Sequence, residues 1–201
     1  MIKETSSSLP LWKTRHDLEW LHHAFTVEKH PEAKAVDTER ASDDQRSVAV
    51  WELDGDKRVT VDFRKFYEAD PLDQIEIVKR GVNARLVDVL ATSMHIPKEK
   101  LIDTLGLTRT TIQRKSRQQK ALSSDESSRV VGLSKLIGQV QAMVQESGAP
   151  EDFDAAAWLA QWLDQSLPAL NGECPGDLMD TAEGQAMVSQ LLGRLQSAAY
   201  A

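Results

Sequence analysis

The spacing of apolar residues along the chain predicts a mainly α protein. From residue 70 onward, apolar side chains recur every three or four positions, as on one face of a helix, and helix-ending residues separate the runs. Asp70 is placed to cap the first helix and Gly81 to end it. Its apolar stripe is expected to consist of Leu72, Ile75 and Val78. Helices are expected over residues 71–80, 83–94, 97–105, 108–118, 124–147, 153–163 and 180–195.

Three of the later helices have recognisable starts. The hydroxyl of Thr108 can accept the amide hydrogen bond that a helix start leaves open. Ser123 or Ser124, together with Glu126, begins the long helix, and Asp180 is followed three residues later by a glutamate, the spacing of a capping box. Each of these residues is therefore expected to hydrogen-bond to the first turn of its helix.

Residues 47–63 have the pattern of a small N-terminal β-hairpin. Val59, Val61 and Phe63 alternate with polar residues, as in a strand with one buried face. Asp54-Gly55 between two such runs is a strong hairpin-turn signal. The ribbon is expected to pack on the helices that follow it, because an isolated hairpin is marginally stable.

Residues 1–46 form the least patterned part of the chain and are expected to be a partly disordered N-terminal extension. Four histidines lie there, at positions 16, 22, 23 and 30. Neighbouring histidines point to different faces of a helix, and no cysteine accompanies them, so the sequence predicts no metal site. The rest divides into a hairpin plus helical domain over 47–122 and a second helical domain over 123–201.

Composition excludes several classes of protein. The chain has 201 residues, of which 41% are apolar and 27% charged, so it can bury a core. Its apolar runs are far shorter than the roughly 20 residues that cross a bilayer. No secretory signal is visible, and the single Cys174 cannot form an internal disulfide. A cytoplasmic protein without a membrane partner is expected.

Charge is unevenly distributed along this acidic chain. Residues 97–120 contain seven basic side chains and two acidic ones, whereas residues 121–201 contain three basic and eleven acidic ones. The formal net charge of the whole chain is -7. One short basic block in an acidic protein indicates a local site for a polyanion.

The basic block has the layout of a helix-turn-helix. Two short helices flank the turn at Gly106-Leu107, and apolar residues stand where two crossed helices must touch. In this motif the second helix enters the major groove of DNA, where arginine can bind guanine and glutamine can bind adenine. The predicted DNA-binding residues are Lys98, Lys100, Arg109, Thr110, Gln113, Arg114 and Arg117.

A solvated basic helix pair without DNA affinity is the alternative. Ile102 stands where a small residue is usual in a helix-turn-helix, and Lys115 stands where an apolar one often helps. An enzyme is not expected, and neither is a cofactor. The chain has no glycine-rich phosphate loop, nucleophile elbow, two-histidine helix or Cys-His arrangement.

Residues 66–198 resemble the Xre/MbcA/ParS family of bacterial antitoxins. The helix-turn-helix is followed by LSSDESSRVVGLSKLIGQVQAMV and then by AWLAQWLDQSLPALNGECPGDLMDTAEGQAMVSQLLGRL, in the order usual for the family. Asn171 stands where a glycine is common, and asparagine tolerates the left-handed backbone nearly as well. The most specific matches are Trp162-Leu163, Pro168-Ala169-Leu170, Gly172, Pro175, Asp177-Leu178, Asp180-Thr181, Glu183-Gly184 and Leu191-Leu192-Gly193-Arg194.

The resemblance implies an antitoxin with two partners besides a second copy of itself. One is a cognate RES-type toxin, a class that depletes NAD, or a related ADP-ribosylating toxin. The other is operator DNA, through which a homodimer represses its own operon. Two alternatives stay open: a stand-alone helix-turn-helix regulator, and a toxin neutraliser that no longer binds DNA.

The resemblance assigns toxin binding to the C-terminal domain, and the residues favour its end. After Leu195 the chain carries no charged side chain, only small or uncharged polar residues and one tyrosine. Such a segment loses little side-chain entropy on docking, and arginine suits an acidic or phosphate-binding pocket. The predicted toxin-binding residues are Gln190, Arg194, Leu195, Ser197 and Tyr200.

Overall fold

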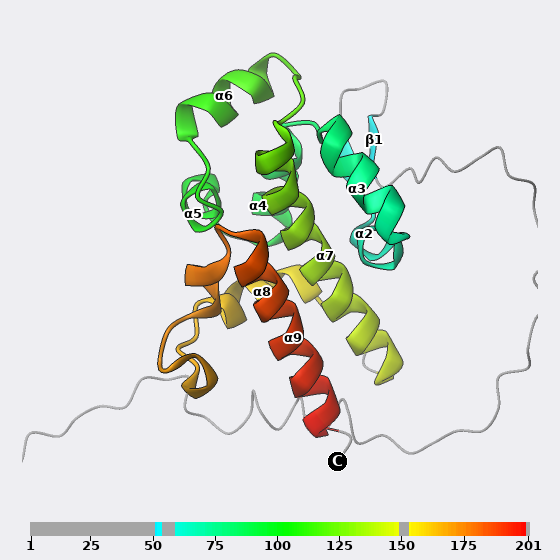
Figure 1. The fold of residues 1–201 in the computed structure, drawn as a ribbon, viewed down its shortest axis with the longest axis vertical. Helices are drawn as coiled ribbons and strands as arrows, with labels where there is room; N and C mark the ends of the chain where they lie inside the picture. The colour runs from blue at the N-terminus through cyan, green and yellow to red at the C-terminus, as the bar shows by residue number, and fades with distance from the viewer. Residues whose placement is uncertain (1–50, 54–58, 149–152, 200–201) are drawn as a thin grey trace, which may run out of the picture.

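The structure is a computed structural model that describes residues 51–53, 59–148 and 153–199, and it is mainly helical, as predicted (Figure 1). The strands β1 (Trp51–Leu53) and β2 (Val59–Val61) are antiparallel, with Trp51 opposite Val61. The predicted turn at Asp54-Gly55, residues 1–50 with their histidines, and Tyr200 lie outside the described residues. The helices are α2 (Phe63–Glu68), α3 (Pro71–Arg80), α4 (Leu86–Ser93), α5 (Lys98–Thr104), α6 (Arg109–Arg117), α7 (Ser124–Glu146), α8 (Ala155–Leu163) and α9 (Ala182–Ala199), with short 3-10 turns η2 (Pro168–Leu170) and η3 (Pro175–Leu178).

The long helix α7 runs through the middle of the molecule, with α2 and α3 on one side and α9 on another (Figure 1). Its predicted start is confirmed, because Ser123 and Glu126 form a capping box. Two glycines of α7 allow neighbours to approach closely. A Cβ atom on Gly138 would lie 2.1 Å from the carbonyl oxygen of Phe63, and one on Gly132 would lie 1.7 Å from Oε1 of Gln185.

One continuous apolar core joins the elements on either side of α7. It extends from Phe63 and Phe66 of α2 to Val188 and Leu192 of α9. The tryptophans of α8 belong to it: Trp162 is buried, and Trp158 packs partly buried against the core. Among the described residues, no helix combines the length and the apolar character needed to span a membrane.

Several predicted helix starts were wrong by a few residues. The second helix does not begin at Asn83, because the side chain of Asn83 accepts a hydrogen bond from the amide of Arg85 in a preceding turn, and α4 begins at Leu86. The hydroxyl of Thr108 makes no cap hydrogen bond to α6. At the start of α9 the cap is Thr181 rather than Asp180, since the Thr181 hydroxyl accepts the amide of Gly184.

Two predictions about apolar positions were also wrong. Phe63 does not continue the strand, because the Asp62 side chain accepts the amide of Lys65 and starts α2. In α3 the buried residue is Ile77, whereas Leu72 is 72% exposed and Ile75 is 50% exposed. The apolar stripe of α3 is therefore largely at the surface.

Candidate functional site

The helix-turn-helix consists of α5, a tight turn and α6. Gly106 in the turn has a φ of +58°, a conformation in which glycine has no steric penalty. The four apolar residues of the motif, Leu101, Leu105, Leu107 and Ile112, are all buried in the core. Thus α6 is held by one face, with its polar face outward.

All predicted residues of α6 are exposed. At 100° per residue, Thr110, Arg114 and Arg117 fall on the side opposite Ile112, whereas Arg109 and Gln113 lie on one flank of the helix, about 60° and 100° from Ile112. Within the part of the chain that the structure describes, the side chains of Thr110, Gln113, Arg114 and Arg117 have no hydrogen bond or ion pair to another residue. These four are open to a ligand, which suits both base contacts and phosphate contacts.

The two predicted lysines of α5 are already paired with carboxylates. Lys98 forms an ion pair with Asp88 of α4, whose side chain also accepts a hydrogen bond from Ser116 of α6 at 2.8 Å. Lys100 forms an ion pair with Asp164, the residue that ends α8. Asp88 was missed by the sequence analysis, although it fastens α4 to both helices of the motif.

Arg109, the first residue of α6, is paired with Asp103 of α5. Its Nε donates to Oδ1 of Asp103 at 3.1 Å, and a second donor of the guanidinium bonds to the other carboxylate oxygen. This hydrogen bonding, with the Coulomb attraction of the same carboxylate, raises the pKa of Arg109 above its ordinary value. Arg109 would have to exchange Asp103 for a base in order to read DNA.

The two unusual residues of the motif fit the structure. Ile102 is 4% exposed and belongs to the core. Lys115 lies between α6 and α7, where its Nζ bonds to Oε2 of Glu126 at 2.5 Å. Burial alone raises the pKa of Glu126, but the hydrogen bonds from Lys115 and Ser123 outweigh it, so the net pKa lies below its ordinary value.

Arg129 of α7 supports the turn of the motif from behind. Its Nη1 donates to the carbonyl oxygens of Leu105 at 3.0 Å and Gly106 at 2.7 Å, and its Nη2 bonds to Asp125. The Nε of Arg129 is buried without a hydrogen-bond partner in the described structure. No sequence signal distinguishes this arginine, because its acceptors are backbone carbonyls more than twenty residues away.

The helix α9 carries the predicted toxin-binding residues in two groups. Gln190, Arg194 and Ser197 are exposed along one side of the helix. Leu195 lies on another side, 100° from Arg194, and is 37% exposed. The structure thus brings three of the five predicted residues together, separates Leu195 from them, and does not describe Tyr200.

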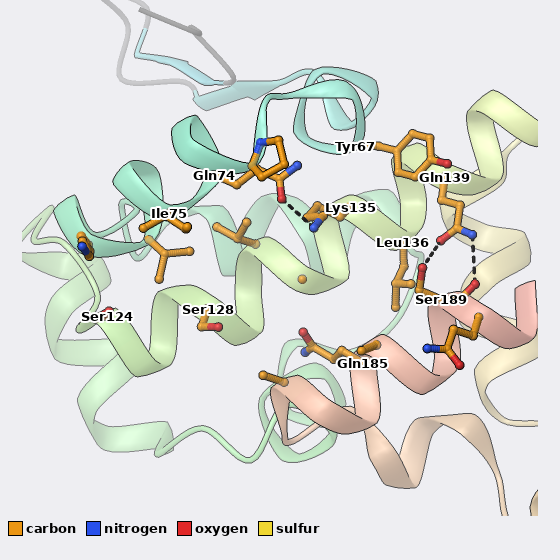
Figure 2. Close-up of a pocket in the computed structure, with 18 residues that line it drawn as sticks. Tyr67, Gln74, Ile75, Ser124, Ser128, Lys135, Leu136, Gln139, Gln185 and Ser189 are labelled. Atoms are coloured by element: carbon orange, nitrogen blue, oxygen red, sulfur yellow. Dashed lines mark hydrogen bonds between the residues drawn. The ribbon is translucent and has the colours of Figure 1, made fainter. Parts of the chain in front are cut away.

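Side-chain hydrogen bonds hold α9 against α7 (Figure 2). Nε2 of Gln139 donates to the carbonyl oxygen of Ser189 at 3.0 Å, and the Ser189 hydroxyl donates back to Oε1 of Gln139 at 2.7 Å. Gln185 is buried and donates to the carbonyls of Arg129 and Met179. These bonds orient the outward face of α9 relative to the helix-turn-helix.

The segment between α8 and α9 is a structured loop. The Leu167 amide donates to the carbonyl of Glu173, and the Gly172 amide donates to the carbonyl of Leu167. Asn171 adopts the left-handed conformation with φ of 56°, which confirms that asparagine replaces the usual glycine without loss of the turn. A Cβ atom on Gly184 would lie 1.9 Å from the carbonyl oxygen of Leu178, so α9 begins close to η3.

Comparisons with known proteins match both regions. Residues 73–135 match the antitoxin Xre-like helix-turn-helix domain, and residues 151–197 match the antitoxin Xre/MbcA/ParS C-terminal toxin-binding domain. A protein of Sphingobium sp. (strain YBL2), the Prs ADP-ribosylating antitoxin, is 43% identical over 139 residues, covering 69% of this chain and 87% of that protein. The chain belongs to the Xre/MbcA/ParS family of antitoxins, with a helix-turn-helix domain and a toxin-binding domain.

Proposed function

We propose that this antitoxin acts in the cytoplasm, where it inhibits a cognate toxin through α9 and represses its own operon through α6. The observation that carries the proposal is the pair of open polar surfaces. One is the face of α6 with four polar or basic side chains that are unpaired in the described structure, and the other is the side of α9 with Gln190, Arg194 and Ser197. Both surfaces belong to regions that match domains of the family.

Operator reading rests on Arg114 and Gln113, since their side chains are not engaged elsewhere in the described structure. Arg114→Ala is expected to cost about 1 to 3 kcal/mol on the upstream region of the operon, as for an arginine that binds a base edge. Lys98→Ala is expected to weaken binding to all duplexes alike. Fluorescence anisotropy with operator and random duplexes measures both losses. Equal loss on the two duplexes for Arg114→Ala would rule out base reading and favour a neutraliser without operator specificity.

The proposed toxin is a RES-type enzyme that depletes NAD. A second candidate is a toxin that transfers ADP-ribose to a protein, which the name of the Sphingobium relative favours. Both chemistries consume NAD, so an arginine on α9 suits the nucleotide-binding cleft of either one.

Co-expression with the protein encoded by the adjacent open reading frame tests this proposal. The antitoxin should restore growth, and Arg194→Glu should reduce that rescue while leaving operator binding unchanged. NAD consumption by the purified toxin, with and without an acceptor protein, separates the two chemistries. Full rescue by Arg194→Glu would place the toxin interface elsewhere.

A two-fold homodimer completes the proposal. One helix-turn-helix offers few DNA contacts, and two copies related by a two-fold axis match an inverted-repeat operator.

A further inference from the structure

A groove lies between α3 and α9, with α7 as its floor (Figure 2). Its volume is about 810 Å³, which is within the usual range of ligand-binding pockets. Apolar groups from all sides contribute to it. The main ones are Tyr67, Ile75, Val78, Val131, Leu136 and Ala186.

Lys135 on the floor of this groove has no counter-charge among the residues that the structure describes. Its Nζ donates to Oε1 of Gln74 at 2.7 Å, and no carboxylate lies within 4.0 Å of it among the described residues. Burial lowers the pKa of Lys135 below its ordinary value. A partly buried ammonium among apolar side chains is stabilised by a carboxylate, so the groove fits an apolar segment that carries an acid.

The helix α3, which forms one wall of the groove, is itself an apolar segment that carries an acid. Three of the five large apolar side chains that are exposed in the described structure belong to α2 and α3: Tyr67, Leu72 and Ile75. Glu76 lies on the same outward side of α3 as Leu72 and Ile75. Both side chains of its ion pair with Arg80 are highly exposed, so this pair contributes little free energy and the Glu76 carboxylate can change partner.

We propose that the groove of each copy receives α3 of a second copy, in a two-fold dimer. Leu72 and Ile75 of one copy pack into the apolar groove of the other, and Lys135 pairs with Glu76 of the partner subunit. In a two-fold interface the same face of each copy must carry both the groove and the helix that enters the partner's groove. This face does so, because α3 lies beside the groove that contains Lys135. The inference rests on the proposed homodimer and assigns its surface.

Sedimentation velocity of the full chain at micromolar concentration tests the assignment. The wild-type protein should sediment at twice the 22.4 kDa of the chain. Ile75→Glu and Lys135→Glu should each raise the dimer dissociation constant at least about tenfold, since each places an unpaired charge in an apolar interface. Met187→Glu is the matched control, because Met187 is 49% exposed but does not line the groove, and it should leave the constant unchanged.

A charge exchange makes the test independent of folding defects. Glu76→Lys alone should weaken the dimer, and Glu76→Lys combined with Lys135→Glu should restore it, because the pair is re-formed with reversed signs. Helix content by circular dichroism shows that each variant is folded. A monomeric wild-type protein, a dimer insensitive to Ile75→Glu, or a double variant no stronger than the single ones would overturn the assignment. Failure to inhibit the toxin by a protein that passes these tests would count against the proposed function alone.

Discussion

Lys100 of α5 is ion-paired with Asp164, which ends α8, so a predicted phosphate-binding side chain is held by the toxin-binding region. If Lys100 contacts DNA as proposed, a phosphate has to displace the Asp164 carboxylate from the same ammonium group. The two residues lie 64 positions apart in the chain, and their contact joins the two regions that match separate domains of the family.

Asp164→Asn should strengthen DNA binding by about 0.2 to 1 kcal/mol, the usual contribution of an exposed ion pair. The gain should be the same on operator and random duplexes, because a phosphate contact carries no base sequence. Fluorescence anisotropy at two salt concentrations measures it. Glu173→Gln is the control, since it removes an equal charge that is not ion-paired with Lys100 in the described structure; an equal gain from Glu173→Gln would point to net charge instead.

Arg129→Ala should lower the free energy of unfolding by about 1 to 3 kcal/mol, because the carbonyl oxygens of Leu105 and Gly106 lose their charged donor. Urea denaturation measures the change. Arg80→Ala removes an arginine from an exposed pair with Glu76 and should change the same quantity by no more than about 0.5 kcal/mol. Comparable effects of the two substitutions would show that Arg129 does not support the turn.

Two glycine-to-alanine substitutions should change the stability of the folded protein in opposite directions. Gly132→Ala places a Cβ atom on the Gln185 side chain and should destabilise by about 1 to 3 kcal/mol. In contrast, a Cβ atom on Gly193 meets no atom of a neighbouring described residue within 4 Å, so Gly193→Ala should stabilise by about 0.5 to 1 kcal/mol through the helix propensity of alanine. Thermal denaturation compares them, and equal shifts would contradict the close packing of α9 on α7.

Deleting residues 196–201 should weaken toxin binding by about 2 kcal/mol or more, as for the loss of an interface hot spot. Operator binding should not change, because the proposed DNA contacts lie on α6 and none of them belongs to the deleted segment. Titration calorimetry with the toxin and anisotropy with DNA give the two readouts. If the shortened protein still neutralises the toxin fully, the interface belongs to the loop from Ser166 to Asp177.

Glu126 should make stability depend on acid pH. Its pKa in the folded protein lies below the ordinary value of 4.5, so the carboxylate contributes stability above that value. The contribution is lost as the pH falls through the lowered pKa of the folded protein. Glu126→Gln should therefore be less stable than the wild type at neutral pH, by about 1 kcal/mol. The difference should shrink at acid pH in urea titrations, and a constant difference would contradict the role of the charge.

Local signals allowed most of the helices and the helix-turn-helix to be predicted. Asp70, Gly81 and the Ser123–Glu126 capping box act within one turn of backbone, so sequence spacing is sufficient to find them. Burial depends instead on which elements meet. The periodicity of α3 predicted Leu72 and Ile75 as buried, but α3 packs through Ile77, and Gln74 bonds to the carbonyls at the end of α2.

Which basic side chains are already paired likewise could not be predicted from the local sequence. Arg109 and Asp103 are close in sequence, but Lys98, Lys100 and Arg129 find their partners through the packing of separate helices. Spacing therefore predicted which face of α6 points outward. It did not predict that three of the seven proposed DNA-binding side chains are neutralised by carboxylates.

The position of α7 within a single core also bears on how the protein loses its structure. Because α7 packs on α2 and α3 as well as on α8 and α9, the helices before it and those after it share one core, and neither group retains its packing once the other has unfolded. If α9 binds the toxin and α6 the operator as proposed, unfolding would release both in the same event, rather than one after the other.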